Sequence, residues 1–136
     1  MRGYQLASGG SGVYQAEEAR ISQGAVESNH LGFNGTGFVN YDNITGSYAE
    51  WTVESSAAAG AVLALRYANG TTANRPMDIS VNGTVVSAGR PFNPTADWDT
   101  WATSSLAVAL KSGTNTIRAT AATADGGPNV DQITIS

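Results

Sequence analysis

The stretch "MDISVNG" at residues 77–83 decides the fold class of this sequence. Apolar side chains at Met77, Ile79 and Val81 alternate with polar ones, which is the period of a strand with one buried face. Asn82-Gly83 follows directly, and this dipeptide is the preferred centre of a two-residue hairpin turn. The stretch therefore predicts a strand that ends in a hairpin.

Similar runs recur along the chain, separated by turn signals at intervals of about 8–15 residues. No stretch of ten residues shows a helical period, so the crossover helices that a parallel sheet needs are missing. The sequence therefore predicts about eight or nine strands in an all-β, antiparallel β-sandwich of the jelly-roll type. The strand-like runs lie at residues 13–21, 37–41, 48–53, 61–68, 77–83, 105–111, 115–122 and 130–136.

The composition narrows the class of protein and of partner. The length of 136 residues fits one domain. The net charge is −4 and the arginines are scattered, so we expect no nucleic-acid partner. No apolar run has membrane-spanning length, so we expect no membrane partner. The absence of cysteine excludes thiolate metal sites, and a single histidine, His30, excludes a multi-histidine zinc site.

The first residues differ from the rest of the chain. Residues 1–12 are rich in Gly and Ser and lack the apolar region of a signal peptide. We interpret them as an interdomain linker or a cloning scar. Residues 13–136 are then the folded domain.

A carboxylate lies in the apolar row of the last strand-like run. In "ADGGPNVDQITIS" (124–136), Asp131 shares one strand face with two isoleucines. In the first run, Gln15 and Glu17 share a face with Ala19 and Ile21 in the same way. The first and last strands of a sandwich often pair, and this pairing would bring the three oxygen-bearing side chains together.

Buried carboxylates are costly unless a cation compensates them. Arg20 is three residues from Glu17 but falls on the opposite strand face, and no lysine or arginine is close in sequence to Asp131. Calcium prefers oxygen ligands of this kind, so the pattern predicts a calcium site at Gln15, Glu17 and Asp131. The alternative is that the two carboxylates lie at strand ends and are solvated.

Two tryptophans lie close together in "DWDTW" (97–101). In an extended segment Trp98 and Trp101 would face opposite ways, so one could be buried and the other exposed. An exposed indole beside polar groups is typical of a sugar-binding platform. The alternative is that both rings belong to the core.

Arg66 is the most informative of the remaining polar residues. It lies on the opposite strand face from Leu63 and Leu65, so it should reach a surface or a cleft, where arginine can bind a carboxylate with two hydrogen bonds. Known catalytic motifs are absent, and Glu17 and Glu18 point to opposite faces of a strand. A small glycosidase or lyase, and a structural or adhesive domain, are the alternatives to a binding module.

The motifs occur in the order found in a known family. The sequence resembles the family 35 carbohydrate-binding modules, relatives of family 6, over residues 14–136. The resemblance implies a jelly-roll sandwich and a non-catalytic module joined in cis to a secreted polysaccharide-degrading enzyme, which it holds near plant or microbial cell-wall glycans. The matching motifs are "YQAEEA", "NHLGFNGTGFVNY", "LRYANGT", "ISVNGT", "WDTWAT", "LKSGTNTIRATAA" and "GGPNVDQI".

The resemblance also implies roles for residues. It places a structural calcium at Gln15, Glu17 and Asp131, where the family usually has Glu in place of Gln15. Members that recognise uronic acids use a second calcium, whereas others bind neutral mannans or galactosides. We expect a monomer that binds a uronic acid, such as glucuronic or unsaturated galacturonic acid. The expected sugar contacts are Asn40, Tyr41, Arg66, Asn69, Trp101 and Asn129, with Trp98 and Asp125 as alternatives.

Overall fold

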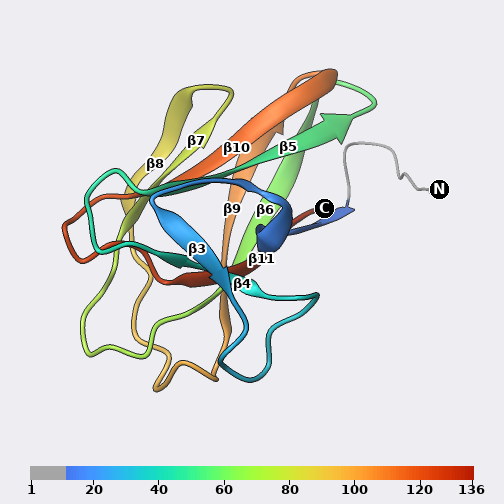
Figure 1. The fold of residues 1–136 in the computed structure, drawn as a ribbon. Coiled ribbons are helices and arrows are strands. Elements are labelled where there is room, and N and C mark those ends of the chain that lie inside the picture. The colour runs from blue at the N-terminus through green and yellow to red at the C-terminus, as the bar shows by residue number, and fades with distance from the viewer. Residues whose placement is uncertain (1–11) are drawn as a thin grey trace.

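The computed structural model describes residues 12–136, which form two antiparallel sheets packed face to face (Figure 1). One sheet has the order β3 (Gly24–Glu27), β4 (Phe38–Tyr41), β11 (Asn129–Ile135), β6 (Ala59–Ala68) and β9 (Ala102–Leu110), and β1 (Gly12–Gln15) also pairs with β11. The other has the order β2 (Arg20–Ser22), β5 (Tyr48–Ser55), β10 (Gly113–Ala121), β7 (Met77–Val81) and β8 (Thr84–Arg90). The prediction of an all-β antiparallel sandwich is confirmed.

The core lies between the two sheets because their strands alternate buried and outward-facing residues. Tyr67 packs edge-to-face on Phe92, with ring centroids 4.9 Å apart. No helix within residues 12–136 has the length and apolar character needed to cross a membrane. Fully buried side chains of the core include Leu63, Leu65, Met77, Ile79, Ile117 and Ile133.

The predicted hairpin at Asn82-Gly83 is confirmed. The two residues join β7 to β8 and have φ angles of 52° and 84°, the positive values that this turn requires. The sequence did not predict β8 as a strand. Its side chains are exposed or partly exposed along its whole length, so it lacks the alternation that reveals a strand.

The predicted single strand at 13–21 is interrupted. A 3₁₀ turn, η2 (Ala16–Glu18), separates β1 in one sheet from β2 in the other. The predicted alternation of side chains therefore fails inside this segment, and Ala16 is buried in the core. The predicted linker at 1–12 lies outside the described residues except for Gly12. Gly12 is the first residue of β1 and pairs with Ile135 of β11.

The first and last strands pair, as the sequence predicts. β1 runs antiparallel to β11, with Gln15 opposite Gln132. The pairing of β11 with β6 shifts between Val130 and Gln132, which makes Asp131 the extra residue of a β-bulge. Val130 and Asp131 are consecutive residues and both are fully buried, so the alternation of a regular strand does not hold at this position. The bulge, rather than simple alternation, sets the direction of the Asp131 side chain.

Candidate functional site

Gln15, Glu17 and Asp131 lie around one loop, and we call these three residues the oxygen cluster. The loop between β3 and β4 donates backbone N–H groups to both carboxylates. Asn34 N donates to Asp131 Oδ1 at 2.9 Å, and Thr36 N donates to Glu17 Oε2 at 2.8 Å. Gly35 of the same loop lies against Gln15 and Glu17. The three side chains that the sequence predicts to be close together are therefore close in the structure.

Arg66 compensates the charge of Asp131. Its Nη1 lies 2.7 Å from Asp131 Oδ2, and it also donates to Gly32 O at 2.9 Å. Burial raises the pKa of the Asp131 carboxyl, against the opposing effect of the Arg66 and Asn34 hydrogen bonds. The sequence argument missed this pair because Arg66 is far from Asp131 in sequence, whereas β6 lies beside β11 in the sheet.

Two oxygen atoms of the oxygen cluster have no partner in the described part of the chain. Gln15 Oε1 and Glu17 Oε1 are buried and accept no hydrogen bond. Gly35 lies against both side chains with φ of +68°, and a Cβ atom there would collide with Glu17 Oε2. Residues 12–136 contain no group of three or more His, Cys, Asp or Glu side chains arranged for a metal. The two acceptors without a partner among these residues, Gln15 Oε1 and Glu17 Oε1, are nevertheless an amide oxygen and a carboxylate oxygen, and both are ligands that a hard cation prefers.

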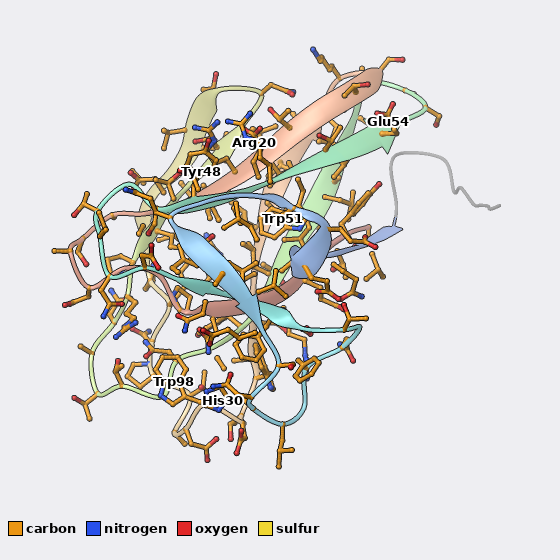
Figure 2. All side chains as sticks on the ribbon, viewed as in Figure 1. Arg20, His30, Tyr48, Trp51, Glu54 and Trp98 are labelled. Carbon is orange, nitrogen blue, oxygen red and sulfur yellow. The ribbon has the colours of Figure 1, made fainter. Side chains whose placement is uncertain are left out.

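A second site lies where the loops of the sandwich meet. This loop-end cavity has a volume of about 310 Å³. Figure 2 shows two of its residues, Trp98 and His30, close together at one end of the sandwich. The residues that line it are Glu27, Asn29, His30, Asn40, Asn43, Arg75, Trp98 and Asn129.

Trp98 is fixed in the wall of the loop-end cavity by its neighbours. A Cβ atom on Gly70 would lie 2.5 Å from the indole, so the backbone of Gly70 packs directly on the ring. The His30 ring is stacked 6.0 Å from Trp98, and the Arg75 guanidinium lies 5.6 Å from the ring centroid. Trp98 is partly exposed, so an aromatic surface remains open to the cavity.

The turn that carries Trp98 is held by Asp97. The Asp97 carboxylate accepts hydrogen bonds from Asp99 N at 2.9 Å and from the Thr100 hydroxyl at 2.8 Å. The Thr100 hydrogen bond lowers the pKa of the Asp97 carboxyl. Residues 97–100 therefore form a turn, and the extended conformation assumed for the two tryptophans does not occur.

Trp101 lies outside the loop-end cavity. Its Nε1 donates to Leu31 O at 2.8 Å, its ring packs on Phe38, and Arg66 lies 5.4 Å from the ring centroid. The hydrogen bond to Leu31 ties the residue that precedes β9 to the loop between β3 and β4. The structure thus places the alternative platform Trp98, rather than the favoured Trp101, at the cavity.

Four other expected sugar contacts are also placed elsewhere. Asn69 is fully buried, and its side-chain Nδ2 donates hydrogen bonds to the backbone carbonyls of Ala73 and Phe92. Tyr41 is buried and donates its hydroxyl hydrogen to Ala119 O. Arg66 is engaged by Asp131, and Asp125 is exposed in a turn that does not line the cavity. Of the expected contacts other than the tryptophans, Asn40 and Asn129 line it.

Sequence reasoning did not assign the remaining cavity residues as ligand contacts. Glu27 accepts a hydrogen bond from Asn40 Nδ2 at 2.9 Å, which orients the wall formed by β3 and β4. His30 Nδ1 lies 3.5 Å from the Asp99 carboxylate, which also accepts from Leu31 N. Arg75 lies in the loop before β7. In the sequence, the only signal for these cavity residues is that they lie in segments rich in turn-forming residues.

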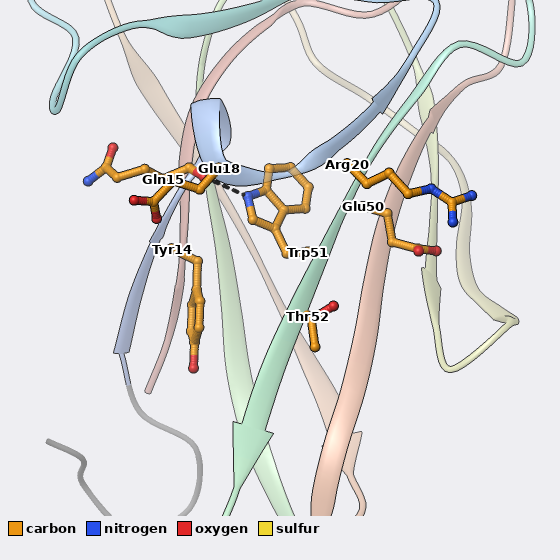
Figure 3. Close-up of a pocket in the computed structure, with 7 residues that line it drawn as sticks. All are labelled: Tyr14, Gln15, Glu18, Arg20, Glu50, Trp51 and Thr52. Atoms are coloured by element: carbon orange, nitrogen blue, oxygen red, sulfur yellow. Dashed lines mark hydrogen bonds between the residues drawn. The ribbon is translucent and has the colours of Figure 1, made fainter. Parts of the chain in front are cut away.

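A larger hollow of about 450 Å³ lies beside β1, η2 and β5 (Figure 3). Its only tryptophan, Trp51, is buried, and the indole N–H donates to Gln15 O at 3.2 Å. Arg20 and Glu50 lie at its other end. It therefore offers no exposed indole, and the loop-end cavity remains the better match to the expected sugar platform.

The sequence matches a known family and known structures. The model of carbohydrate binding module family 6 matches residues 15–136. The chain is 56% identical over 122 residues to the exo-beta-D-glucosaminidase of Amycolatopsis orientalis, a match that covers 90% of this chain but 12% of that enzyme. The chain thus spans about an eighth of the length of this relative.

Solved structures are similar over nearly the whole chain. A family 35 carbohydrate binding module from Clostridium thermocellum has a TM-score of 0.90 and 45% identity, covering 92% of this chain and 96% of that one. Xyl-CBM35, solved in complex with a disaccharide that contains glucuronic acid, has a TM-score of 0.82 and 33% identity and covers 91% of both chains.

Proposed function

Since the chain belongs to the family 35 carbohydrate-binding modules, relatives of family 6, we propose that its loop-end cavity binds a uronic acid unit of a polysaccharide. Modules of this family are non-catalytic parts of larger glycoside hydrolases. The observation that carries the proposal is Arg75 beside Trp98 in one cavity. Trp98 offers a surface for the apolar face of a sugar ring, and Arg75 offers charged donors for its carboxylate.

The other side chains of the loop-end cavity suit sugar hydroxyl groups. Asn40 and Asn129 carry both donors and acceptors, and Asn129 is nearly buried at the start of β11. Arg75 Nη1 makes one long hydrogen bond, 3.3 Å, to Gly127 O, so most of its donors remain for a ligand. The related Xyl-CBM35, which was solved with a glucuronic-acid-containing disaccharide, supports a uronic acid for this chain as well.

We also propose that the oxygen cluster holds one calcium ion. The two buried acceptors without partners, Gln15 Oε1 and Glu17 Oε1, support this assignment. The ion would supply positive charge to the carboxylates of Glu17 and Asp131 and fix the loop between β3 and β4. A second ion at the loop-end cavity would find only one carboxylate there, Glu27, which already accepts from Asn40. Our proposal therefore includes a single structural calcium.

The setting of the module follows from its relatives. The glucosaminidase is about eight times longer than this chain, so we propose that the module is joined in cis to a catalytic domain. We propose that this enzyme is secreted and that the module, as a monomer, holds it near a cell-wall glycan that is too large to enter a cell. Binding to the glycan raises the local concentration of the catalytic domain.

Calorimetric titration tests the proposal. We expect glucuronic or galacturonic acid to bind with a dissociation constant of roughly micromolar to millimolar, because one stacked ring and a few hydrogen bonds form a small interface. Glucose, mannose and galactose should bind more weakly. Tight binding of mannan or galactose without binding of uronic acids would contradict the proposal and favour a neutral ligand. Release of reducing ends from polysaccharides would contradict the non-catalytic role.

A further inference from the structure

A second hollow adjoins the loop-end cavity. It has a volume of about 300 Å³ and shares Glu27, Asn40 and Asn43 with the first. Each volume is at the lower end of the range for ligand sites, which suits about one sugar ring in each. We call this hollow the adjoining pocket. Its lining residues are Ala25, Glu27, Asn40, Tyr41, Asp42, Asn43 and Ile44.

The loop-end cavity and the adjoining pocket are separated by two side chains that are hydrogen-bonded to each other, Glu27 and Asn40. Asn40 donates from Nδ2 to Glu27 Oε1 at 2.9 Å, and both residues line both hollows. Polar atoms of this pair can therefore be reached from either side. A ligand that lies across the pair would occupy both hollows without any rearrangement of the strands.

The loop that forms the far side of the adjoining pocket is held in place by hydrogen bonds. Asp42 N donates to Gln23 O at 2.9 Å, and the Ser47 hydroxyl lies within hydrogen-bond distance of the carbonyls of Asp42 and Ile44. Gly46 N donates to Ala121 O at 3.0 Å. A loop that is already fixed loses little conformational entropy when a ligand binds.

The exposed side chains of this loop suit a sugar. Ile44 is 45% exposed, and an aliphatic surface of this kind can pack on the apolar face of a ring. Asp42 is exposed, and its carboxylate can accept hydrogen bonds from two neighbouring hydroxyl groups. The pocket has no arginine or lysine, so its chemistry favours a neutral sugar over a second uronic acid.

We propose that the adjoining pocket binds the neutral sugar unit to which the uronic acid is linked. The inference rests on the proposed function of the loop-end cavity, and it means that the module recognises a disaccharide. The uronic acid lies against Trp98, the glycosidic bond crosses the Glu27–Asn40 pair, and the neutral ring lies between Asp42 and Ile44.

Calorimetry with two ligands tests the inference. The ligands are glucuronic acid and a disaccharide of glucuronic acid and xylose. We expect the wild-type chain to bind the disaccharide roughly 10-fold more tightly, because a second ring adds contacts without a second cost of association. Ile44→Ser and Asp42→Ala should each remove most of this advantage and leave the affinity for glucuronic acid unchanged. Val85→Ser, an exposed valine on β8 in the other sheet, is the matched control.

The outcomes separate the two levels of the proposal. Equal affinity for both ligands in the wild-type chain overturns the adjoining pocket while the proposed function stands. A disaccharide advantage that survives in both variants also overturns it. If neither ligand binds, the proposed function fails, and the adjoining pocket fails with it.

Discussion

The oxygen cluster and the loop-end cavity lie at opposite ends of the same loop, yet they are built differently. The oxygen cluster has two carboxylates that accept hydrogen bonds from the backbone N–H groups of Asn34 and Thr36, and two buried oxygen atoms without a partner among residues 12–136. The loop-end cavity is lined by side chains, among them His30 from the same loop, that keep polar atoms open to solvent. Changes in the cluster should therefore alter stability first, and changes in the cavity should alter binding first.

A chain of contacts joins the two regions. Arg66 binds Asp131 and also Gly32 O, and its guanidinium lies over Trp101. Trp101 in turn binds Leu31 O, next to His30 in the wall of the cavity. Arg66 and Trp101, which the sequence suggested as sugar contacts, thus hold the loop that separates the two regions.

The largest expected effect is on stability in the oxygen cluster. Arg66→Met should lower the free energy of unfolding by about 3 kcal/mol in calcium-free buffer, because it leaves the fully buried Asp131 without its charge partner. The melting temperature should fall by roughly 10 °C. Thermal denaturation followed by circular dichroism measures the change.

Arg118→Met is the matched control for this change. Arg118 pairs with Glu50 at 2.9 Å, but both side chains are partly exposed, at 36% and 18%. Such a pair contributes about 1 kcal/mol or less. Equal losses of stability in the two variants would show that Asp131 does not depend on Arg66, and the distinction between the two regions would weaken.

Calcium should stabilise the fold through the oxygen cluster. At 100-fold excess over its dissociation constant, the ion should add about 2.7 kcal/mol to the free energy of unfolding. Melting curves with calcium and with chelator measure this difference. Glu17→Gln should reduce it, whereas Glu18→Gln should not, because Glu18 is exposed and outside the cluster. The assignment is overturned by a wild-type melting temperature that is the same in calcium and in chelator.

The two tryptophans should separate binding from stability. Trp98→Ala should weaken glucuronic acid binding by about 2 kcal/mol, roughly 30-fold, because an aromatic anchor of the cavity is lost. Trp101→Ala should instead cost about 2 kcal/mol of folding free energy, because its ring packs on Phe38 and Arg66. Titration and thermal melting of both variants give the two values. The reverse pattern would identify Trp101 as the platform.

The same contrast explains what the sequence could predict. The oxygen cluster depends on the pairing of the first and last strands, which the strand order of sandwiches makes predictable. Its charge compensation was not predictable, because Arg66 reaches Asp131 only through the adjacency of β6 and β11 and the bulge at Asp131. A bulge leaves no mark in a period-two pattern.

The loop-end cavity was harder to predict because it depends on which loops meet. Glu27, Arg75 and Asn129 come from three distant segments, and only the complete strand order brings them together. The choice between Trp98 and Trp101 depended on the conformation of one short segment. The Asp97 hydrogen bonds make it a turn, and the extended geometry assumed from the sequence does not apply.

The smallest expected effect is a change in sugar affinity that tests whether Arg75 acts through its charge or through its packing on Trp98. Arg75→Gln should weaken glucuronic acid binding roughly 10-fold, because a charge-assisted hydrogen bond becomes a neutral one. Binding of glucose, which has the same ring without the carboxylate, should change little, so titration of both sugars measures the preference for the acid. Arg20→Gln, in the larger hollow beside β1, η2 and β5, is the matched control. An equal loss for both sugars would assign Arg75 to the support of Trp98, over which its guanidinium lies, and leave the uronic acid without a charged partner in the cavity.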